Sequence, residues 1–536
     1  WNVNILLIPD CVKHDPITLL SRASKIDGQR WCFSFPFSGI RMESCDDVEQ
    51  LGFTLEAVGI SFSDTSPVEA EDLIRQVSHA TSKEAKLAAM KHLEVEHELL
   101  RGIGLRASLR NGGCVWMTPA DKLSSGEKMD RWQTSIKVDH FDVFISHTWL
   151  TAGRWKILCL LLASSWPILL FGWALAVLGA IPCHLVDVSF PMTLVYSCTS
   201  LDFEGTCSSH LFAHYLGLIG TLIGLLVAPY LRCCDKMCFL DVVSINQAEE
   251  EKEAGIYAIG GFLAVSAELT ILWDRPYFSR LWCIFELAAF RKCNPQGKIT
   301  LKPLFVETCV AVGVGFIYLL KFMHWTFLTI GWTETLSLVL RLIATLAFMH
   351  YLRHLLYTRC QLINDLRNFE LTHVNCGSDF DRDFIYAGIE AWYGSSAAFT
   401  EYVRGPLADE LAKPFSKFRV SRAYWALAAT PSVSYELCLS LSLIRTDASD
   451  AAILWTFMLR TSNVLLDLVC MKLLVMTCDY FASPRRWNSG KTLFVWAGWA
   501  ISTWGLWQLK FFTDSQDQFA AVLSCLTLVI ASVTPW

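Results

Sequence analysis

The sequence predicts a parallel-sheet α/β domain combined with an α-helical membrane domain of about eight spanning helices. Between Cys238 and Glu307, short apolar runs alternate with segments of helical period, which is the pattern of parallel strands covered by helices on both faces. Elsewhere, apolar runs exceed the roughly 20 residues that cross a bilayer. Apolar residues make up 53% of the chain, which is too high for an ordinary soluble protein.

The sheet domain is predicted from strands and helices that alternate along the chain. Strands are expected at Phe239–Val243, Leu269–Trp273 and Ile299–Phe305, with helices at Ile256–Val265 and Leu281–Phe290. A doubly wound sheet needs one more strand at its start. His140–His147, about a hundred residues upstream, supplies an apolar run of the right length.

These elements resemble a TIR (Toll/interleukin-1 receptor-like) domain. The matching segments, in the order of the family, are Asp142–His147, Phe239–Asp241, the W-C-x-x-E-L helix Trp282–Leu287, and Lys302–Phe305. They cover about a third of the chain, and the resemblance implies a flavodoxin-like sheet that acts in signalling through self-association. Two longer sequence segments in this multi-pass chain, HTWLTAGRW and RLWCIFELAAF, are similar to segments of uncharacterised TIR-like membrane proteins of protists (dinoflagellate-type).

The resemblance also implies a candidate site. In TIR domains that hydrolyse NAD, the Glu of this motif is catalytic, so Glu286 would stabilise the positive charge on the ribose as nicotinamide leaves. Ser146, His147 and Trp282 would line the pocket, with NAD as a substrate and no cofactor. The alternative is an adaptor in which Glu286 forms a surface ion pair and Trp282 belongs to the core. The loop after the first strand departs from the family, because it leads into a membrane segment.

Residues 1–139 are predicted to be a soluble region. Strands are expected at Asn4–Ile8 and Trp31–Phe35, and a helix from Pro67 to about Gly102 carries a rough apolar stripe. This helix either packs on the sheet domain or binds a partner. Gly112–Lys128 is interpreted as a linker. Because the chain begins at Trp1, we expect further sequence before it.

A membrane hairpin is predicted inside the sheet domain. Ile157–Leu185 and Leu211–Leu231 are each long enough to cross, and two crossings return the chain to the side where the first strand must pair. The loop Cys183–His210 has no Lys or Arg and is expected outside. The flanking basic residues are Arg154, Lys156, Arg232 and Lys236. By the positive-inside rule, the sheet domain is therefore expected in the cytosol.

The remaining apolar runs complete a count of eight crossings with both termini cytosolic. They are about Cys309–Ile330, Leu336–Leu352, Tyr424–Ile444, Ala451–Cys478, Leu493–Phe511 and Phe519–Val533. Between them, Asp379, Asp381 and Asp383 alternate before a helix, and we interpret them as favourable helix-start charges rather than a calcium site. The predicted divisions, in chain order, are a soluble N-terminal region, the first strand of the TIR-like domain, an inserted membrane hairpin, the rest of the TIR-like domain, a second membrane hairpin, a cytosolic helical segment and four membrane helices. Their bounds are 1–139, 140–153, 154–232, 233–307, 308–352, 353–421 and 422–536.

The 20 cysteines show no disulfide-framework spacing, so most are expected as reduced thiols. Cys183, Cys198 and Cys207 lie in the predicted outer loop, where one disulfide can form between an undetermined pair. Cys233 and Cys234 lie just inside the membrane and are either palmitoylated or free thiols.

Several function classes are disfavoured, and one further class stays open. The spread net charge of −6 argues against nucleic-acid binding, phosphate-binding glycine motifs are absent, and the histidine spacing is poor for metal. The expected partners are the lipid bilayer and further copies of the chain. Charged residues within apolar runs favour a transporter or channel, or else pair structurally, as Glu436 can with Arg460. They are Lys321, Arg341, Glu436, Arg460, Asp467 and Lys472.

Overall fold

The computed structural model describes two compact units, residues 1–92 and 93–536. The described residues are 23–26, 30–33, 95–186, 193–231, 235–247, 252, 255–256, 258–331, 333–415 and 420–482. In the first unit, β1 (Ala23–Ile26) pairs antiparallel with β2 (Arg30–Phe33). β2 overlaps the predicted strand Trp31–Phe35. The predicted strand Asn4–Ile8 and most of the helix from Pro67 lie outside the described residues.

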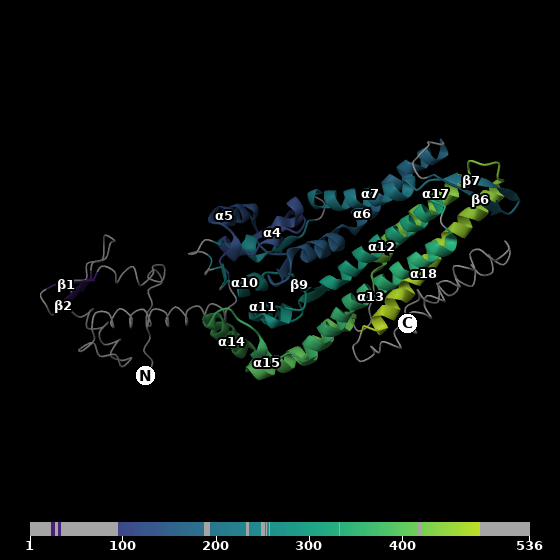
Figure 1. The fold of residues 1–536 in the computed structure, drawn as a ribbon. Coiled ribbons are helices and arrows are strands. Elements are labelled where there is room, and N and C mark those ends of the chain that lie inside the picture. The colour runs from purple at the N-terminus through teal and green to yellow at the C-terminus, as the bar shows by residue number, and fades with distance from the viewer. Residues whose placement is uncertain are drawn as a thin grey trace. The chain divides into compact units, whose positions relative to one another are not determined.

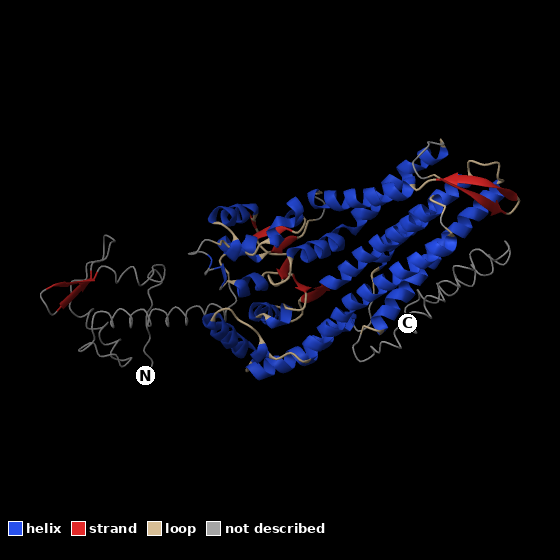
Figure 2. Ribbon diagram, in the orientation of Figure 1, coloured by secondary structure: helices blue, strands red, loops and turns tan. Residues whose placement is uncertain are grey.

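The second unit contains a six-stranded mixed sheet in the order β10-β9-β5-β8-β3-β4 (Figure 2). Its strands are β3 (Arg101–Gly104), β4 (Ile136–Lys137), β5 (Val143–Ser146), β8 (Met237–Phe239), β9 (Glu268–Trp273) and β10 (Lys298–Pro303). β8, β5, β9 and β10 are parallel neighbours. In chain order they stand as 2-1-3-4, as in doubly wound sheets of the flavodoxin type.

The inner parallel strands β5 and β9 form because their residues are buried on both faces. All four residues of β5 are buried, and the ring of Phe144 stacks on that of Phe239 at 4.4 Å. Two helices, α10 (Ile259–Ala264) and α11 (Leu281–Cys293), connect the later strands. The helices that cover strands on both faces explain why these strands lack the alternating pattern of a half-exposed sheet.

Two predictions for the region before β5 were wrong. The helix expected to end near Gly102 gives way to β3, which pairs antiparallel with β8. The predicted linker Gly112–Lys128 instead contains α4 (Cys114–Met117) and the start of α5 (Ser125–Thr134). The physical reason is Trp116, which is fully buried and donates from Nε1 to Ser108 Oγ at 3.2 Å.

Five helices are long and apolar enough to cross a membrane, among the described residues (Figure 1). They are α6 (Gly153–Leu185), α7 (Phe212–Val227, extended by a 3₁₀ turn to Tyr230), α12 (Leu304–Thr329), α13 (Glu334–Arg367) and α18 (Asp450–Tyr480). α17 (Arg422–Leu443) packs against α6, α7, α12 and α18 but is less apolar. The predicted runs Leu493–Phe511 and Phe519–Val533 lie outside the described residues, so the count of eight stays a prediction.

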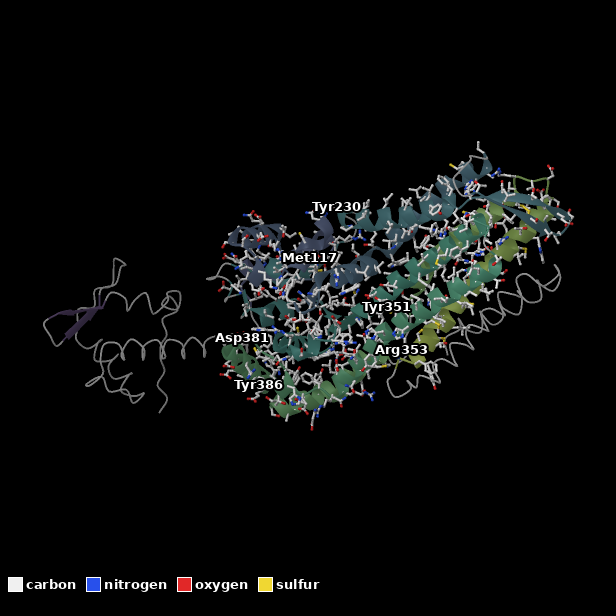
Figure 3. All side chains as sticks on the ribbon, in the orientation of Figure 1. Met117, Tyr230, Tyr351, Arg353, Asp381 and Tyr386 are labelled. Carbon is white, nitrogen blue, oxygen red and sulfur yellow. A yellow bond between two sulfur atoms is a disulfide. The ribbon has the colours of Figure 1, made fainter. Side chains whose placement is uncertain are left out.

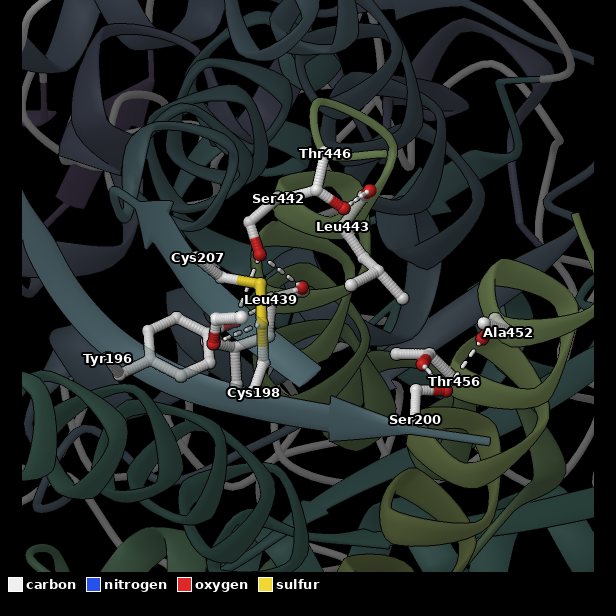
Figure 4. The surroundings of a disulfide bond; sticks show 11 residues. Tyr196, Cys198, Ser200, Cys207, Leu439, Ser442, Leu443, Thr446, Ala452 and Thr456 are labelled. Carbon is white, nitrogen blue, oxygen red and sulfur yellow. Dashed lines mark hydrogen bonds between the residues drawn. A yellow bond between two sulfur atoms is a disulfide. The ribbon is translucent and has the colours of Figure 1, made fainter. Parts of the chain in front are cut away.

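The loop between α6 and α7 contains a hairpin of β6 (Leu194–Ser200) and β7 (Phe203–Ser209). A disulfide joins Cys198 to Cys207, which identifies the pair that the sequence left open (Figure 4). Two hydrogen bonds fasten the hairpin to the helix ends. Ser200 Oγ donates to the carbonyl of Ala452 at 2.8 Å, and Tyr196 OH lies 2.9 Å from Ser442 Oγ.

The helices extend further toward the sheet than the sequence indicated. α12 begins at Leu304, directly after β10, so the predicted strand to Phe305 ends two residues early. α13 continues to Arg367 and leads to α14 (Asp379–Tyr393), α15 (Ser396–Tyr402) and α16 (Ala408–Ala412). Asp379 and Asp381 lie in the first turn of α14, as their interpretation as helix-start charges requires, whereas Asp383 follows that turn.

Candidate functional site

The candidate site lies beside β5 and β9, where the sheet changes direction. The chain leaves β5 toward β8 on one side, and it leaves β9 toward β10 on the other. In doubly wound sheets, ligands bind outside the carboxyl ends of strands at such a switch point. Ser146 is the last residue of β5, and Glu286 lies on α11, the helix that follows β9.

A hydrogen-bonded trio joins three elements at this point. Ser146 Oγ donates to Glu286 Oε2, and the same Oγ lies 2.6 Å from Tyr277 OH. Ser146 and Tyr277 are fully buried, whereas Glu286 remains partly exposed. The trio therefore holds one partly exposed carboxyl group through the Ser146 hydroxyl, which in turn bonds the Tyr277 hydroxyl.

Burial controls the protonation of this carboxyl group. Burial raises the pKa of Glu286 to about 8, the hydrogen bond from Ser146 opposes that rise, and the charge of Asp241 adds to it. Burial also raises the pKa of Tyr277 well above its usual value, so its phenol is neutral. At neutral pH the Glu286 carboxyl is therefore mostly protonated, and it becomes an anion only as the pH passes about 8.

The structure separates His147 from this trio. Its ring packs between Trp116, at 5.3 Å between centroids, and Trp149, at 4.8 Å. Burial, and next the charge of Lys156, lower the pKa of His147 well below 6.5, so the imidazole is neutral. Its backbone carbonyl accepts a bond from Cys283 Sγ at 3.5 Å. His147 thus borders the site as an aromatic packing residue.

Trp282 points toward α14. Its Nε1 donates to Asp381 Oδ2 at 3.3 Å, and its ring meets Phe285 edge-on at 5.5 Å. Figure 3 labels Asp381 and Tyr386 on this helix. Of the four predicted site residues, the structure therefore brings Ser146 and Glu286 together, and places His147 and Trp282 in other contacts.

A second group of residues at the same strand ends was not predicted. Trp149 Nε1 donates to Asp241 Oδ2 at 2.7 Å, and Lys156 Nζ lies 4.6 Å from the centre of the Trp149 ring. Lys156 was expected to be a basic flank of the membrane segment, yet its side chain is fully buried. The sequence feature that could have predicted this burial is the position of Lys156 in the first turn of a helix that starts shortly after β5. Such a helix begins inside the sheet domain.

No metal-binding group emerges among the residues that the structure describes, since no three His, Cys, Asp or Glu side chains cluster suitably. Comparison of the chain with models of protein families, with curated proteins and with solved structures finds no match.

Proposed function

We propose that this protein is a multi-pass membrane signalling protein, in which a cytosolic TIR-like domain acts through protein–protein interaction, including self-association. The observation that carries this proposal is the direct connection between the parallel strands and the apolar helices. β10 ends at Pro303 and α12 begins at Leu304, so no residue separates them. β5 is followed by α6 after residues 147–152, and α7 leads into β8.

These junctions are tightly held. Thr151 Oγ1 donates to Asp274 Oδ2 at 3.1 Å, which ties the segment before α6 to the end of β9. A Cβ on Gly153, the first residue of α6, would lie only 2.2 Å from the carbonyl oxygen of Trp116. A shift of α6 or α12 therefore moves the strand ends directly, because no flexible linker separates helix from strand. Such coupling is what a signalling protein needs to transmit a change from its membrane helices to its sheet domain. The loop Cys183–His210 has no Lys or Arg, whereas Arg154 and Lys236 flank the first hairpin on the sheet side, which supports a cytosolic sheet domain.

A second candidate is NAD hydrolysis, which the meeting of Ser146 and Glu286 at the switch point favours. A carboxylate beside the ribose stabilises an oxocarbenium-like transition state. Because the Glu286 carboxyl is mostly protonated at neutral pH, this chemistry would strengthen as the pH rises through about 8. A rate of NAD hydrolysis that rises through pH 8 would distinguish this candidate from a hydrolase whose catalytic carboxylate has an ordinary pKa.

The test uses the full chain reconstituted in liposomes at several protein densities. Energy transfer between donor- and acceptor-labelled copies measures self-association, and nicotinamide release measures NAD hydrolysis at pH 7 and pH 8.5. We expect density-dependent transfer that Glu286→Gln leaves unchanged, and no release above protein-free liposomes. Transfer no greater than that of an unrelated membrane protein would overturn the signalling proposal. Release that Glu286→Gln abolishes would establish the hydrolase instead.

A further inference from the structure

Charged side chains inside the helical bundle pair with one another. Lys321 Nζ on α12 lies 2.6 Å from Asp467 Oδ2 on α18. Arg460 Nη1 lies 3.3 Å from Glu436 Oε2 on α17, so the predicted pairing of these two residues is confirmed. A structural role therefore accounts for these four charges.

Two arginines beside α6 and α7 have no such acidic partner. Arg106 and Arg110 flank a 3₁₀ turn, Ala107–Leu109, that follows β3. Within the part of the chain that the structure describes, neither forms an ion pair with an Asp or Glu side chain. Asp235 accepts a hydrogen bond from the backbone N–H of Arg106 at 2.8 Å, so it contacts the main chain and not the guanidinium group.

Backbone carbonyl groups of the two helices hold both guanidinium groups in place. Arg106 Nη2 donates to the carbonyl of Ser164 on α6 at 3.3 Å, and Nη1 donates to that of Leu231, just past α7, at 3.5 Å. Arg110 Nε donates to the carbonyl of Pro229 at 3.1 Å. The two positive charges therefore lie at the sheet-side ends of the α6–α7 pair.

The membrane surface passes close to these contacts. On α6, Leu160 belongs to the core of the sheet domain, whereas Phe171 is 68% exposed, as expected of a side chain that faces lipid. From Ser164 to its end at Leu185, α6 is about 32 Å long, which matches the roughly 30 Å of a hydrocarbon core. Tyr230, labelled in Figure 3, is exposed at the end of α7, where an amphipathic ring suits the membrane interface.

Arg110 retains hydrogen-bond donors for a further ligand. Only its Nε donates among the described residues, so the N–H groups on Nη1 and Nη2 have no acceptor there. Its Cζ lies 6.0 Å from the centre of the Tyr230 ring, and the side chain is half-buried. A guanidinium group whose fork of N–H donors is available matches two oxygen atoms of a phosphate group.

We propose that Arg106 and Arg110 bind the phosphate group of an anionic phospholipid, such as phosphatidylserine, in the leaflet on the sheet side of the membrane. Charge complementarity selects this partner, because two guanidinium groups without an acidic partner attract a negative headgroup at the membrane surface. In the arrangement proposed above, this is the cytosolic leaflet, which carries the anionic lipids. The site rests on the crossing of α6 and α7, and it stands without any signalling role.

The alternative is that the two arginines only cap a helix end. Arginine side chains commonly bond the last carbonyl groups of a helix, and Pro229 and Leu231 lie at the end of α7. Capping requires only the bonds to these carbonyl groups. It predicts no preference for one phospholipid headgroup over another.

The test measures phospholipid binding to the purified full chain in detergent micelles. Native mass spectrometry counts the bound molecules as phosphatidylserine or phosphatidylcholine is added. Wild type should bind its first phosphatidylserine about twentyfold more tightly than phosphatidylcholine, since each arginine near the surface contributes about fivefold. Arg110→Gln keeps a donor for the Pro229 carbonyl but loses the charge and the fork, so its preference should fall to about fivefold. Arg106→Gln/Arg110→Gln should show no preference.

Arg154→Gln is the matched control. Arg154 is an exposed basic residue in the first turn of α6, about 15 Å along the helix from Ser164. This distance exceeds the screening length of about 8 Å in physiological salt, so the preference for phosphatidylserine should stay unchanged.

Three results would overturn the proposal. The first is equal binding of the two phospholipids by wild type, which decides the matter even where the variants do not fold. The second is an unchanged preference in the folded double variant, which would leave capping as the role of both arginines. The third is binding of glycerophosphoserine, the headgroup without its acyl chains, as tightly as phosphatidylserine, which would indicate a site for soluble phosphate esters.

Discussion

At the scale of single residues, the partly buried carboxyl of Glu286 is the most informative group in the sheet domain. It is held by Ser146, which in turn bonds Tyr277, so three separate elements share one hydrogen-bonded unit. A carboxyl in this position is most stable when protonated, because burial disfavours the anion. The unit therefore stabilises the domain most below pH about 4.5, and less as the pH rises toward 8.

This protonation predicts how stability depends on pH. The Glu286 pKa is about 8 in the folded chain against 4.5 for the ordinary group, so the folded state binds the extra proton between these values. Stability therefore falls as pH rises from about 4.5 to 8 and then levels off. Glu286→Gln cannot ionise, and its stability relative to wild type should increase by about 1–2 kcal/mol between pH 6 and 8.5, after allowance for partial exposure.

Thermal unfolding of both proteins across this pH range measures the difference. Glu401→Gln, at an exposed acid on α15, serves as the control for exchanging a carboxylate for an amide. A constant difference between Glu286→Gln and wild type from pH 6 to 8.5 would show that Glu286 is ionised throughout, and that burial does not control it.

The sequence predicted part of this site and missed the rest for physical reasons. Ser146 and Glu286 were placed together because motif order fixes which strand and helix carry them. The Trp282 side chain points toward Asp381, which lies about a hundred residues later in the chain. No local sequence pattern reveals such a long-range contact. Tyr277 lies in a 3₁₀ turn, where its side-chain direction has no periodicity to predict it.

At the scale of elements, the closest helix contact is between α6 and α7. A Cβ on Gly172 would lie 2.4 Å from the carbonyl oxygen of Gly220, and a Cβ on Gly220 would lie 2.4 Å from that of Gly172. Small residues let membrane helices approach to this distance. The hydropathy of these helices predicted that they form a hairpin, but not how closely they pack, since the contact requires facing glycines on two segments.

This contact predicts a large effect from one methyl group. Gly220→Ala must separate the two backbones, and we expect a loss of about 1–3 kcal/mol, as for overpacking of a core. Gly179→Ala, in α6, meets nothing within 4 Å and should be neutral or stabilising by about 0.5–1 kcal/mol, because Ala favours helix. Thermal unfolding in micelles compares the two variants. Equal melting temperatures would mean that α6 and α7 do not touch at these glycines.

The antiparallel edge of the sheet shows where element prediction fails. β3 has the sequence Arg-Gly-Ile-Gly, and two glycines in four residues give no strand preference. It forms because β8 offers an unpaired edge, with Ile103 opposite Cys238. Strands β5 and β9 were predictable because each is a largely apolar, buried run. The strand expected at Phe239–Val243 was wrong beyond Phe239, because the chain turns there into α8 (Asp241–Ser244). β3 depends on a partner strand more than a hundred residues away.

At the scale of the whole molecule, the disulfide and the sheet should lie on opposite sides of the membrane. Strand β5 pairs with β8 and β9, so an even number of crossings must separate them, and α6 and α7 provide two. The β6–β7 hairpin between these helices carries the Cys198–Cys207 disulfide, which is typical of an oxidising compartment. Cys114, beside the sheet, is exposed and free, as expected in the cytosol.

Labelling with a membrane-impermeant maleimide tests this arrangement in sealed vesicles of known orientation. From the cytosolic side, the reagent should modify Cys114 without prior reduction, and Cys114→Ser should remove that product. From the opposite side, it should modify Cys198 and Cys207 only after an impermeant reductant has acted, because the disulfide blocks both thiols. Mass spectrometry assigns the sites. Modification of Cys114 and of the reduced hairpin from one side would refute the crossing of α6 and α7.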